Sequence, residues 1–205
     1  LGGVAPRVDD PIDDLLDLLD LEDIDLDIFR GRNEAVRSHR IFGGQVAAQS
    51  LVAAARTVDG QLAHSLHGYF LRPGDPSVPV VFTVDRIRDG RSFTTRHVVA
   101  RQKGRAIFNM SVSFQQHEQG YEHQMPMPDA PDPESLPTRA ELVKRHFERI
   151  PEADRHWVAQ PRPVDVRHVD LPTYFGGGPR SGQNLVWMRV PRALDDDPAL
   201  HQRLL

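Results

Sequence analysis

The sequence predicts an α+β protein in which an antiparallel sheet wraps around one long central helix. Residues 45–58 can form a helix that is apolar on nearly every face, and such a helix has to be enclosed by other structure. Segments with the alternating pattern of β-strands follow it directly, at residues 62–72, 79–88, 92–102 and 105–116. A long apolar helix followed by this run of strands indicates a sheet that curls around the helix.

The chain opens with a predicted amphipathic helix and a predicted strand. Asp10 suits the N-cap position and Pro11 suits the first turn. Aspartates form one face of this helix, and apolar side chains recur at helical spacing on the other, at Ile12, Leu15, Leu16 and Leu19. The pattern indicates a helix that docks by one side. Residues 25–30 then alternate with period two and predict one short strand that ends at Gly31.

The segments after the central helix predict an antiparallel meander. Within 105–116 one face is apolar and carries Ala106, Phe108, Met110, Val112 and Phe114. Asp89-Gly90 and Lys103-Gly104 supply tight turns between neighbouring strands, because glycine tolerates the positive φ that such turns require. A sheet of this kind curled around a long helix is the hotdog fold.

The rest of the chain predicts a linker followed by new secondary structure. Residues 116–137 are rich in proline, which disfavours the interior of helices and sheets. Strand-like segments begin at 164–166 and cover 185–190, on either side of a glycine-rich loop. Between the linker and these segments, 138–150 predicts a short helix that buries Leu142, Val143, Phe147 and Ile150.

The predicted parts of the chain are an N-terminal helix (1–22), a first hotdog domain (23–117), a linker with a short helix (118–160) and the start of a second hotdog domain (161–205). Asp197-Pro198 predicts a further helix start, so the order strand, connection and helix begins a second time. A helix of about two turns is marginal on its own in water. We therefore expect one complete hotdog copy and a second copy that this sequence does not complete.

Composition and charge exclude several classes of function. The 205 residues carry a formal net charge of −4 and the basic residues are scattered, which excludes nucleic acid as an expected partner. Zero cysteines exclude a disulfide framework, a thiolate metal site and a cysteine nucleophile. No apolar run approaches the roughly 20 residues that a membrane span needs. We expect a cytoplasmic protein that needs no cofactor.

Several stretches of the sequence, taken in order, resemble one enzyme family. They are 42–45 (FGGQ), 64–75 (HSLHGYFLRPGD), 88–93 (RDGRSF), 110–115 (MSVSFQ) and His201-Gln202. Together they resemble the TesB-like acyl-CoA thioesterase II family, whose members fuse two hotdog domains in one polypeptide. The resemblance implies that the protein takes fatty acyl-CoA as substrate and cleaves the thioester with water, which releases coenzyme A and a fatty acid.

The resemblance assigns no catalytic residue within 1–205. In the family, an Asp, a Thr and a Gln of the second hotdog domain position and activate the water. The Asp follows a His-Gln-x-Leu-Leu stretch by a few residues, and that stretch corresponds here to 201–205. The three residues are therefore expected beyond Leu205, and helix capping explains Asp195 and Asp197 better than catalysis does. Since no G-x-S-x-G elbow occurs, direct attack by water is the expected mechanism.

The central helix contains three candidates for substrate binding: Gly44, Gln45 and Gln49. Free N–H groups near Gly44 and Gln45 could hydrogen-bond a thioester oxygen, or the glycines could simply lead the chain into the helix. Gln49 is the lone large polar residue in the apolar part of this helix. It is either a binding residue, since a buried amide needs partners, or a surface-facing position.

His64 is the fourth candidate for substrate binding. It is expected to share a sheet face with Leu66 and Phe70, where it would border the acyl chain; a structural, hydrogen-bonded histidine is the alternative. His64 and His67 are three positions apart on a strand, so we expect them to face opposite sides and to bind no metal. The hairpin at 88–91 is expected to be an exposed turn, although its arginines could also meet the phosphates of coenzyme A.

Two other functions remain open. A hotdog hydratase acting on enoyl or hydroxyacyl thioesters would need a His and an acid near the central helix, and residues 45–58 contain no Asp, Glu or His. A non-catalytic acyl-CoA-binding subunit would bind its ligand without turnover. Exposed sheet edges favour a homo-oligomer. If the acyl chain lies along the central helix, Leu51→Trp should change the preferred chain length.

Overall fold

The computed structural model describes residues 10–33, 40–178 and 182–200, which form two compact units. The sheet unit is built from the described residues of Leu16–Tyr121 and Asp195–Leu205, and the C-terminal unit from those of Leu1–Leu15 and Glu122–Leu194. The predicted domain limits stay predictions. None of the helices in the described ranges is long and apolar enough to cross a membrane.

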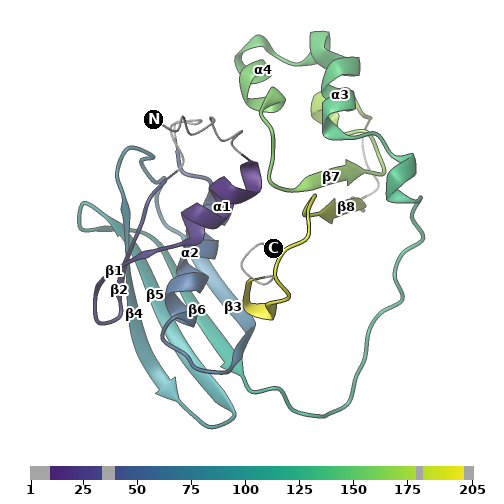
Figure 1. The fold of residues 1–205 in the computed structure, drawn as a ribbon. Helices are drawn as coiled ribbons and strands as arrows, with labels where there is room; N and C mark the ends of the chain where they lie inside the picture. Colours follow the sequence, from purple (N-terminus) through teal and green to yellow (C-terminus); the bar gives the residue numbers. More distant parts are fainter. Residues whose placement is uncertain (1–9, 34–39, 179–181, 201–205) are drawn as a thin grey trace, which may run out of the picture. The chain divides into compact units, whose positions relative to one another are not determined.

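The sheet unit contains a six-stranded antiparallel sheet in the order β1-β2-β4-β5-β6-β3 (Figure 1). Its strands are β1 (Glu22–Asp25), β2 (Ile28–Gly31), β3 (Leu62–Phe70), β4 (Val80–Asp89), β5 (Phe93–Gln102) and β6 (Arg105–Gln115). The β4–β5–β6 meander confirms the predicted one. β3, which precedes this meander in the chain, pairs with its last strand, β6, and so lies at one edge of the sheet.

The prediction of a single strand over 25–30 is wrong. The chain instead forms the β1–β2 hairpin, in which Glu22 pairs with Arg30. It turns at Asp27, which adopts a φ of 58°. The carboxylate of Asp27 accepts hydrogen bonds from Arg86 at 2.9 Å, and this contact lowers the pKa of Asp27. A non-glycine residue in the left-handed region was the feature that the alternation of the sequence did not reveal.

The central helix α2 (Gly43–Ala55) lies against one face of the sheet and contacts β2 through β6 (Figure 1). Its residues Val52, Ala53 and Ala54 are buried, as is the predicted apolar face of β6 at Met110, Val112 and Phe114. The predicted wrapped helix is therefore confirmed. It ends at Ala55 and not at 58, because the N–H and the hydroxyl of Thr57 both donate to the Ala54 carbonyl and tighten the last turn.

A buried arginine lies between the sheet and the C-terminal end of α2. Only 1% of Arg96 on β5 is exposed. Its guanidinium donates to the Thr57 hydroxyl at 2.7 Å, to the Thr57 carbonyl at 3.0 Å and to the Arg88 carbonyl at 3.0 Å. It also pairs with Asp89. The side chain thus satisfies backbone carbonyls that a core position would otherwise leave without donors.

The two glycine turns are built differently. Lys103 and Gly104 have φ values of 48° and 76°, as predicted for a tight hairpin turn. Gly90 is not among the residues with positive φ, so that part of the prediction is wrong. A Cβ at Gly90 would lie 2.5 Å from the Phe93 carbonyl oxygen, so close approach of the backbone requires glycine there.

The first helix, α1 (Pro11–Leu19), confirms the predicted N-terminal helix. The carboxylate of Asp10 accepts a hydrogen bond from the Ile12 N–H at 2.9 Å, as expected of an N-cap. The helix buries Ile12, Leu18 and Leu19.

The C-terminal unit contains more helix than strand. It contains η1 (Pro133–Ser135), α3 (Arg139–His146), η2 (Phe147–Arg149), α4 (Glu152–Ala159), η3 (Thr173–Phe175) and the β7–β8 hairpin (Asp165–His168 and Val186–Arg189). A capping box between Thr138 and Glu141 starts α3 where predicted. The core includes Leu142, Ile150, Val158 and Phe175.

One expectation for the C-terminal unit is wrong, and one of its helices was missed. Phe147 is 40% exposed and not buried, and the Arg155 guanidinium lies 4.7 Å from the centre of its ring. The helix α4 was not predicted, although Val158 on it joins the core. The strands β7 and β8 confirm the two predicted strand segments, and 116–132 contain neither helix nor strand.

Candidate active site

The N-terminus of α2 is the first part of the candidate site. Phe42 precedes the helix in an extended conformation and makes no side-chain cap, so the first-turn N–H groups have no partner within the helix. A Cβ at Gly43 would lie 2.9 Å from the ring of Phe70, and a Cβ at Gly44 would overlap the ring of Phe42. The two glycines are therefore needed where aromatic rings pack on the backbone, beside N–H groups that a carbonyl oxygen could use.

Exposed apolar side chains continue from this helix start along β3. Phe70 pairs with Phe108 and Leu66 with Val112, so both point toward the face that carries α2. They nevertheless remain 64% and 54% exposed, and Phe42 is 77% exposed. We call Phe42, Leu66 and Phe70 the β3 strip. Within the sheet unit this strip is an apolar surface beside α2, at an edge strand.

Gln45 and Gln49 both reach the segment that follows β2. The Gln45 amide donates to the Arg32 carbonyl and to the Asn33 side chain, each at 3.3 Å. The Gln49 amide donates to the Leu18 carbonyl at 2.8 Å and to the Arg32 carbonyl at 3.0 Å. Gln49 is fully buried, so a surface-facing position is excluded. Its Oε1 atom has no hydrogen-bond partner in the described part of the chain.

Replacing Gln49 with methionine is expected to lower the free energy of unfolding by about 1–3 kcal/mol. Methionine keeps most of the volume but leaves the Leu18 and Arg32 carbonyls without this donor. The matched control is Gln45→Met, which removes longer hydrogen bonds from a partly exposed site and should change stability by no more than about 0.5 kcal/mol. Urea denaturation of both variants measures the difference, and equal losses would contradict the structural role of Gln49.

His64 lies on the other face of the sheet, so its predicted place beside Leu66 and Phe70 is wrong. The pairing of β3 with β6 shifts between Ala63 and Ser65, which makes His64 the extra residue of a β-bulge. Its Nε2 atom lies 2.8 Å from the Ser113 hydroxyl and its ring 5.6 Å from that of Phe93. For the same reason His64 and His67 share the outer face, contrary to the alternation assumed from their spacing.

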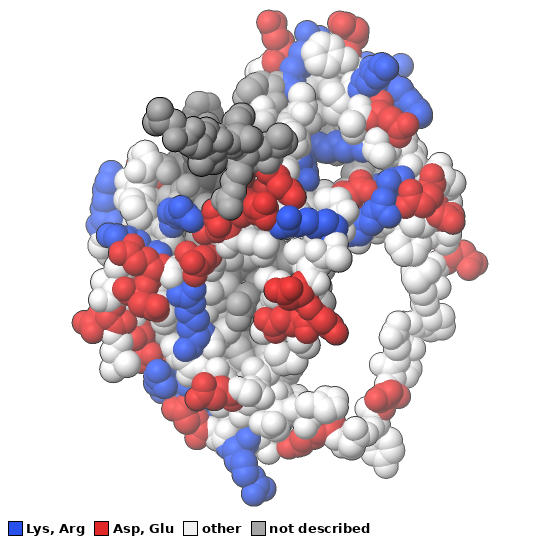
Figure 2. Space-filling view, in the orientation of Figure 1, with Lys and Arg blue, Asp and Glu red and all other residues white. Residues whose placement is uncertain are grey.

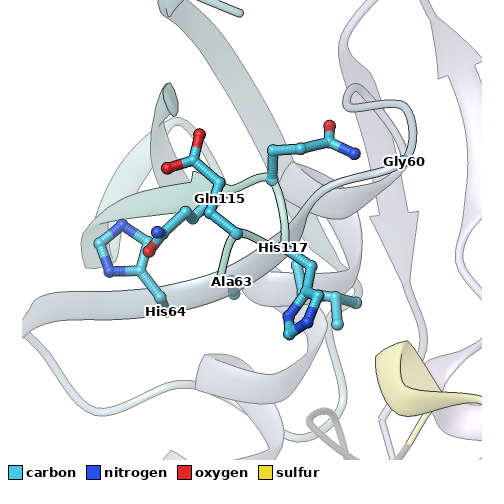
Figure 3. A pocket seen from close by; sticks show the side chains of 8 residues that line it. Gly60, Ala63, His64, Gln115 and His117 are labelled. Carbon is cyan, nitrogen blue, oxygen red and sulfur yellow. The ribbon is translucent and has the colours of Figure 1, made fainter. Parts of the chain in front are cut away.

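A hollow of about 270 Å³ lies beside His64. His64, Gln115, His117 and Glu118 contribute to its lining, and Figure 3 shows the imidazoles of His64 and His117 pointing in different directions. In the described ranges no three His, Cys, Asp or Glu side chains are placed to hold a metal ion. The hollow lies at the start of β3, about 20 Å from Phe70 at about 3.3 Å per residue. The structure thus groups Gly44, Gln45 and Gln49 on α2 and separates His64 from them.

Comparison with known proteins places the chain in a family. The family model of the acyl-CoA thioesterase N-terminal domain matches residues 33–115, which include α2 and β3–β6. Acyl-CoA thioesterase 2 of Haemophilus influenzae is 34% identical over 197 residues, which cover 96% of this chain and 69% of that protein. The chain belongs to the acyl-CoA thioesterase II family.

The chain spans about half of the length of two of the curated relatives that it matches. The chain is 40% identical to mouse acyl-coenzyme A thioesterase 8 over 183 residues and spans 57% of that protein's length. It is 42% identical to the crystal structure of an acyl-CoA thioesterase II from Mycobacterium marinum, with a TM-score of 0.69 and coverage of 93% of this chain and 64% of that chain. A hot dog protein from Alicyclobacillus acidocaldarius, 22% identical with a TM-score of 0.68, confirms the predicted fold.

The sequence analysis placed Leu66 and Phe70 on a face that borders the acyl chain, but it missed their exposure and the contribution of Phe42 to the β3 strip. Alternation places a side chain on a face, but it does not say whether the strand lies at the edge of the sheet. The candidate roles of Gly44, Gln45, Gln49 and His64 in substrate binding stay predictions.

Proposed function

We propose that the protein hydrolyses fatty acyl-CoA thioesters to a free fatty acid and coenzyme A. The observation that carries the proposal is similarity of 34% to 42% identity, over most of this chain, to proteins named acyl-CoA thioesterases. Direct attack by water suits a chain with zero cysteines and no G-x-S-x-G elbow. As the resemblance to the family implies, the proposal assigns the activation of the water to an Asp, a Thr and a Gln that follow the stretch at 201–205.

In this proposal, residues of the sheet unit hold the substrate. The N–H groups at Gly44 and Gln45 hydrogen-bond the thioester oxygen, where negative charge grows as water attacks. The β3 strip takes the apolar part of the substrate. Leu51 is only 6% exposed, so the space between α2 and the sheet is filled and the acyl chain lies along the strip. Leu51→Trp would therefore overpack the core and destabilise the fold, so this substitution does not test the acyl site.

We also propose that the enzyme works in the cytoplasm as a homo-oligomer, with no metal and no cofactor. The lack of cysteine in the sequence suits a reducing compartment. β3 is an edge strand with exposed apolar side chains, and such an edge favours association with another strand.

Thiol release from saturated acyl-CoA substrates tests the proposed reaction, because the protein contributes no thiol of its own. The full-length natural protein is expected to release coenzyme A, whereas the 205-residue chain is expected to be inactive. Activity of the 205-residue chain would refute the placement of catalytic residues beyond Leu205. Water addition to an enoyl-CoA without thiol release would instead identify a hydratase, and acyl-CoA binding without turnover would identify a non-catalytic subunit.

Leu66→Trp in the full-length protein is expected to lower kcat/KM for long-chain acyl-CoA by about ten-fold relative to short-chain acyl-CoA. The larger ring would occupy part of the β3 strip and shorten the path of the acyl chain. Ile87→Trp is the control, since Ile87 is 62% exposed on β4 and lies outside the strip. Rates measured across a series of chain lengths give the comparison. An unchanged length profile in Leu66→Trp would exclude the strip as the acyl site.

A further inference from the structure

Three basic side chains gather where β5 turns into β6. Lys103 lies in the turn, Arg105 pairs with Gln102, and Arg72 follows β3. A fourth, Arg101, pairs with Val81 and donates to the Thr83 hydroxyl at 3.3 Å, on the face of the sheet away from α2. Arg72 donates from its side chain to the Ala106 carbonyl at 2.8 Å and from its backbone to the Ile107 carbonyl at 3.2 Å. We call Arg72, Lys103 and Arg105 the basic hairpin end.

The positive charge of the basic hairpin end is largely unneutralised. Lys103 is the member with an ionic partner, Asp75, at 3.8 Å. Asp75 accepts hydrogen bonds from the Ser77 hydroxyl at 2.6 Å and from the Ser77 N–H at 2.9 Å, and these lower its pKa and keep it ionised. Within the described residues Arg72 and Arg105 form no ion pair. Three cations thus face one carboxylate, and the surface favours an anion.

The basic hairpin end lies at the same end of the sheet as the start of α2. The Ile41 N–H donates to the Gly74 carbonyl at 3.0 Å, and Gly74 is so close that a Cβ there would lie 2.8 Å from Ile41 and 3.3 Å from Ile107. The ring of Phe70, two residues before Arg72, packs on Gly43. The N-terminal end of α2, the exposed aromatic rings and the basic side chains are therefore neighbours.

The other arginine hairpin lies at the opposite end of α2. The Arg88 carbonyl accepts from Arg96, which also binds Thr57 just beyond the C-terminus of α2. The arginines at 88–91 are therefore separated from Gly44 by the length of the helix, about 20 Å for 13 residues at 1.5 Å each. This separation disfavours them as contacts to a ligand whose thioester reaches Gly44. On the face drawn in Figure 2 acidic and basic side chains are interspersed, as expected of an ordinary solvated surface.

We propose that the basic hairpin end binds the phosphate groups of coenzyme A, while the pantetheine arm crosses Phe42 and Phe70 toward Gly44. The inference rests on the proposed thioesterase function, to which it adds the nucleotide subsite. Arginine suits this task because its planar fork forms charge-assisted hydrogen bonds with phosphate oxygens. Exposed aromatic rings suit the uncharged arm between the phosphates and the thioester.

The test is a calorimetric titration of the full-length protein with coenzyme A, which needs no turnover, and with pantetheine, which lacks the phosphates. Lys103→Gln/Arg105→Gln is expected to raise the Kd for coenzyme A by about ten-fold and to leave pantetheine binding unchanged. The matched control is Lys144→Gln/Arg145→Gln, which removes one lysine and one arginine from an exposed part of α3. It should change the Kd by less than about two-fold. Raising the salt concentration should weaken coenzyme A binding more in the wild type than in the hairpin variant.

Each other outcome refutes the inference. An unchanged Kd in the hairpin variant, an equal loss in the control, or an equal loss for pantetheine would do so, as would failure of the wild type to bind coenzyme A. A loss in Arg88→Gln/Arg91→Gln alone would place the phosphates at the opposite hairpin.

Thiol-release assays distinguish failure of the proposed phosphate site from failure of the proposed thioesterase function. Normal turnover with an unchanged KM in the hairpin variant leaves the thioesterase standing without this subsite. Charge-dependent binding without turnover leaves a coenzyme A site that is not a thioesterase.

Discussion

Replacing Arg96 with methionine is expected to lower the free energy of unfolding by about 3–5 kcal/mol, because the two buried acceptors on Thr57 lose their donor. The side chain is 1% exposed, and its guanidinium satisfies the hydroxyl and carbonyl of Thr57 and the carbonyl of Arg88. Methionine fills similar space but donates no hydrogen bond. The substitution would leave buried acceptors without partners at the junction of α2, β4 and β5, and each such acceptor costs about 1–3 kcal/mol.

Urea denaturation followed by circular dichroism measures this loss. The control is Asp89→Asn, which removes the ionic partner of Arg96 while its carbonyl acceptors remain. The Asp89 side chain is 63% exposed, so its loss should cost no more than about 1 kcal/mol. If Arg96→Met cost as little as Asp89→Asn, the buried hydrogen bonds would not be the source of stability.

Phe114→Ala is expected to cost about 3–5 kcal/mol of unfolding free energy, the usual range for removing a buried aromatic side chain. Phe114 is 1% exposed on β6 and faces the side of the sheet that α2 covers. Truncation leaves a cavity between helix and sheet that neighbouring strands cannot close, since both are paired in register.

The control for this substitution is Phe93→Ala on the neighbouring strand. Phe93 is 43% exposed and pairs with Gln115 on the outer face, where its ring contacts His64. Its loss should cost about 1 kcal/mol, because the side chain is removed from water only in part. Chemical denaturation of the two variants measures the two losses of unfolding free energy. Similar losses would mean that the face toward α2 is not the core of this sheet.

The sequence was sufficient to predict the centre of the fold. The face of β6 that carries Met110 and Phe114 is apolar throughout, so its burial under a long helix follows from alternation alone. The Lys103-Gly104 turn likewise follows from a local preference. Such features depend on residues that lie close together in the chain, so the sequence alone predicts them.

The features that were not predicted depend on partners far away in the chain. Arg96 is buried because Thr57, 39 positions earlier, offers it two acceptors. Phe147 stays exposed because the core of its unit is filled by other side chains, and Arg155 covers it. In the candidate site, Gly44 and Gln45 were found from their place at a helix start. The exposure of Phe42 and Phe70 depends on β3 being an edge strand, which strand order alone decides.

The bulge in β3 also bears on how this strand tolerates changes in length. Two residues of β3, His64 and Ser65, stand opposite Ser113, so position 64 is surplus to the ladder. Deleting it would join Ala63 to Ser65 in regular alternation, and Leu66, Gly68 and Phe70 would keep the faces they have now. An insertion or deletion elsewhere in β3 would turn every following side chain over. Position 64 is therefore where this strand can lose one residue while the apolar surface beside α2 is preserved.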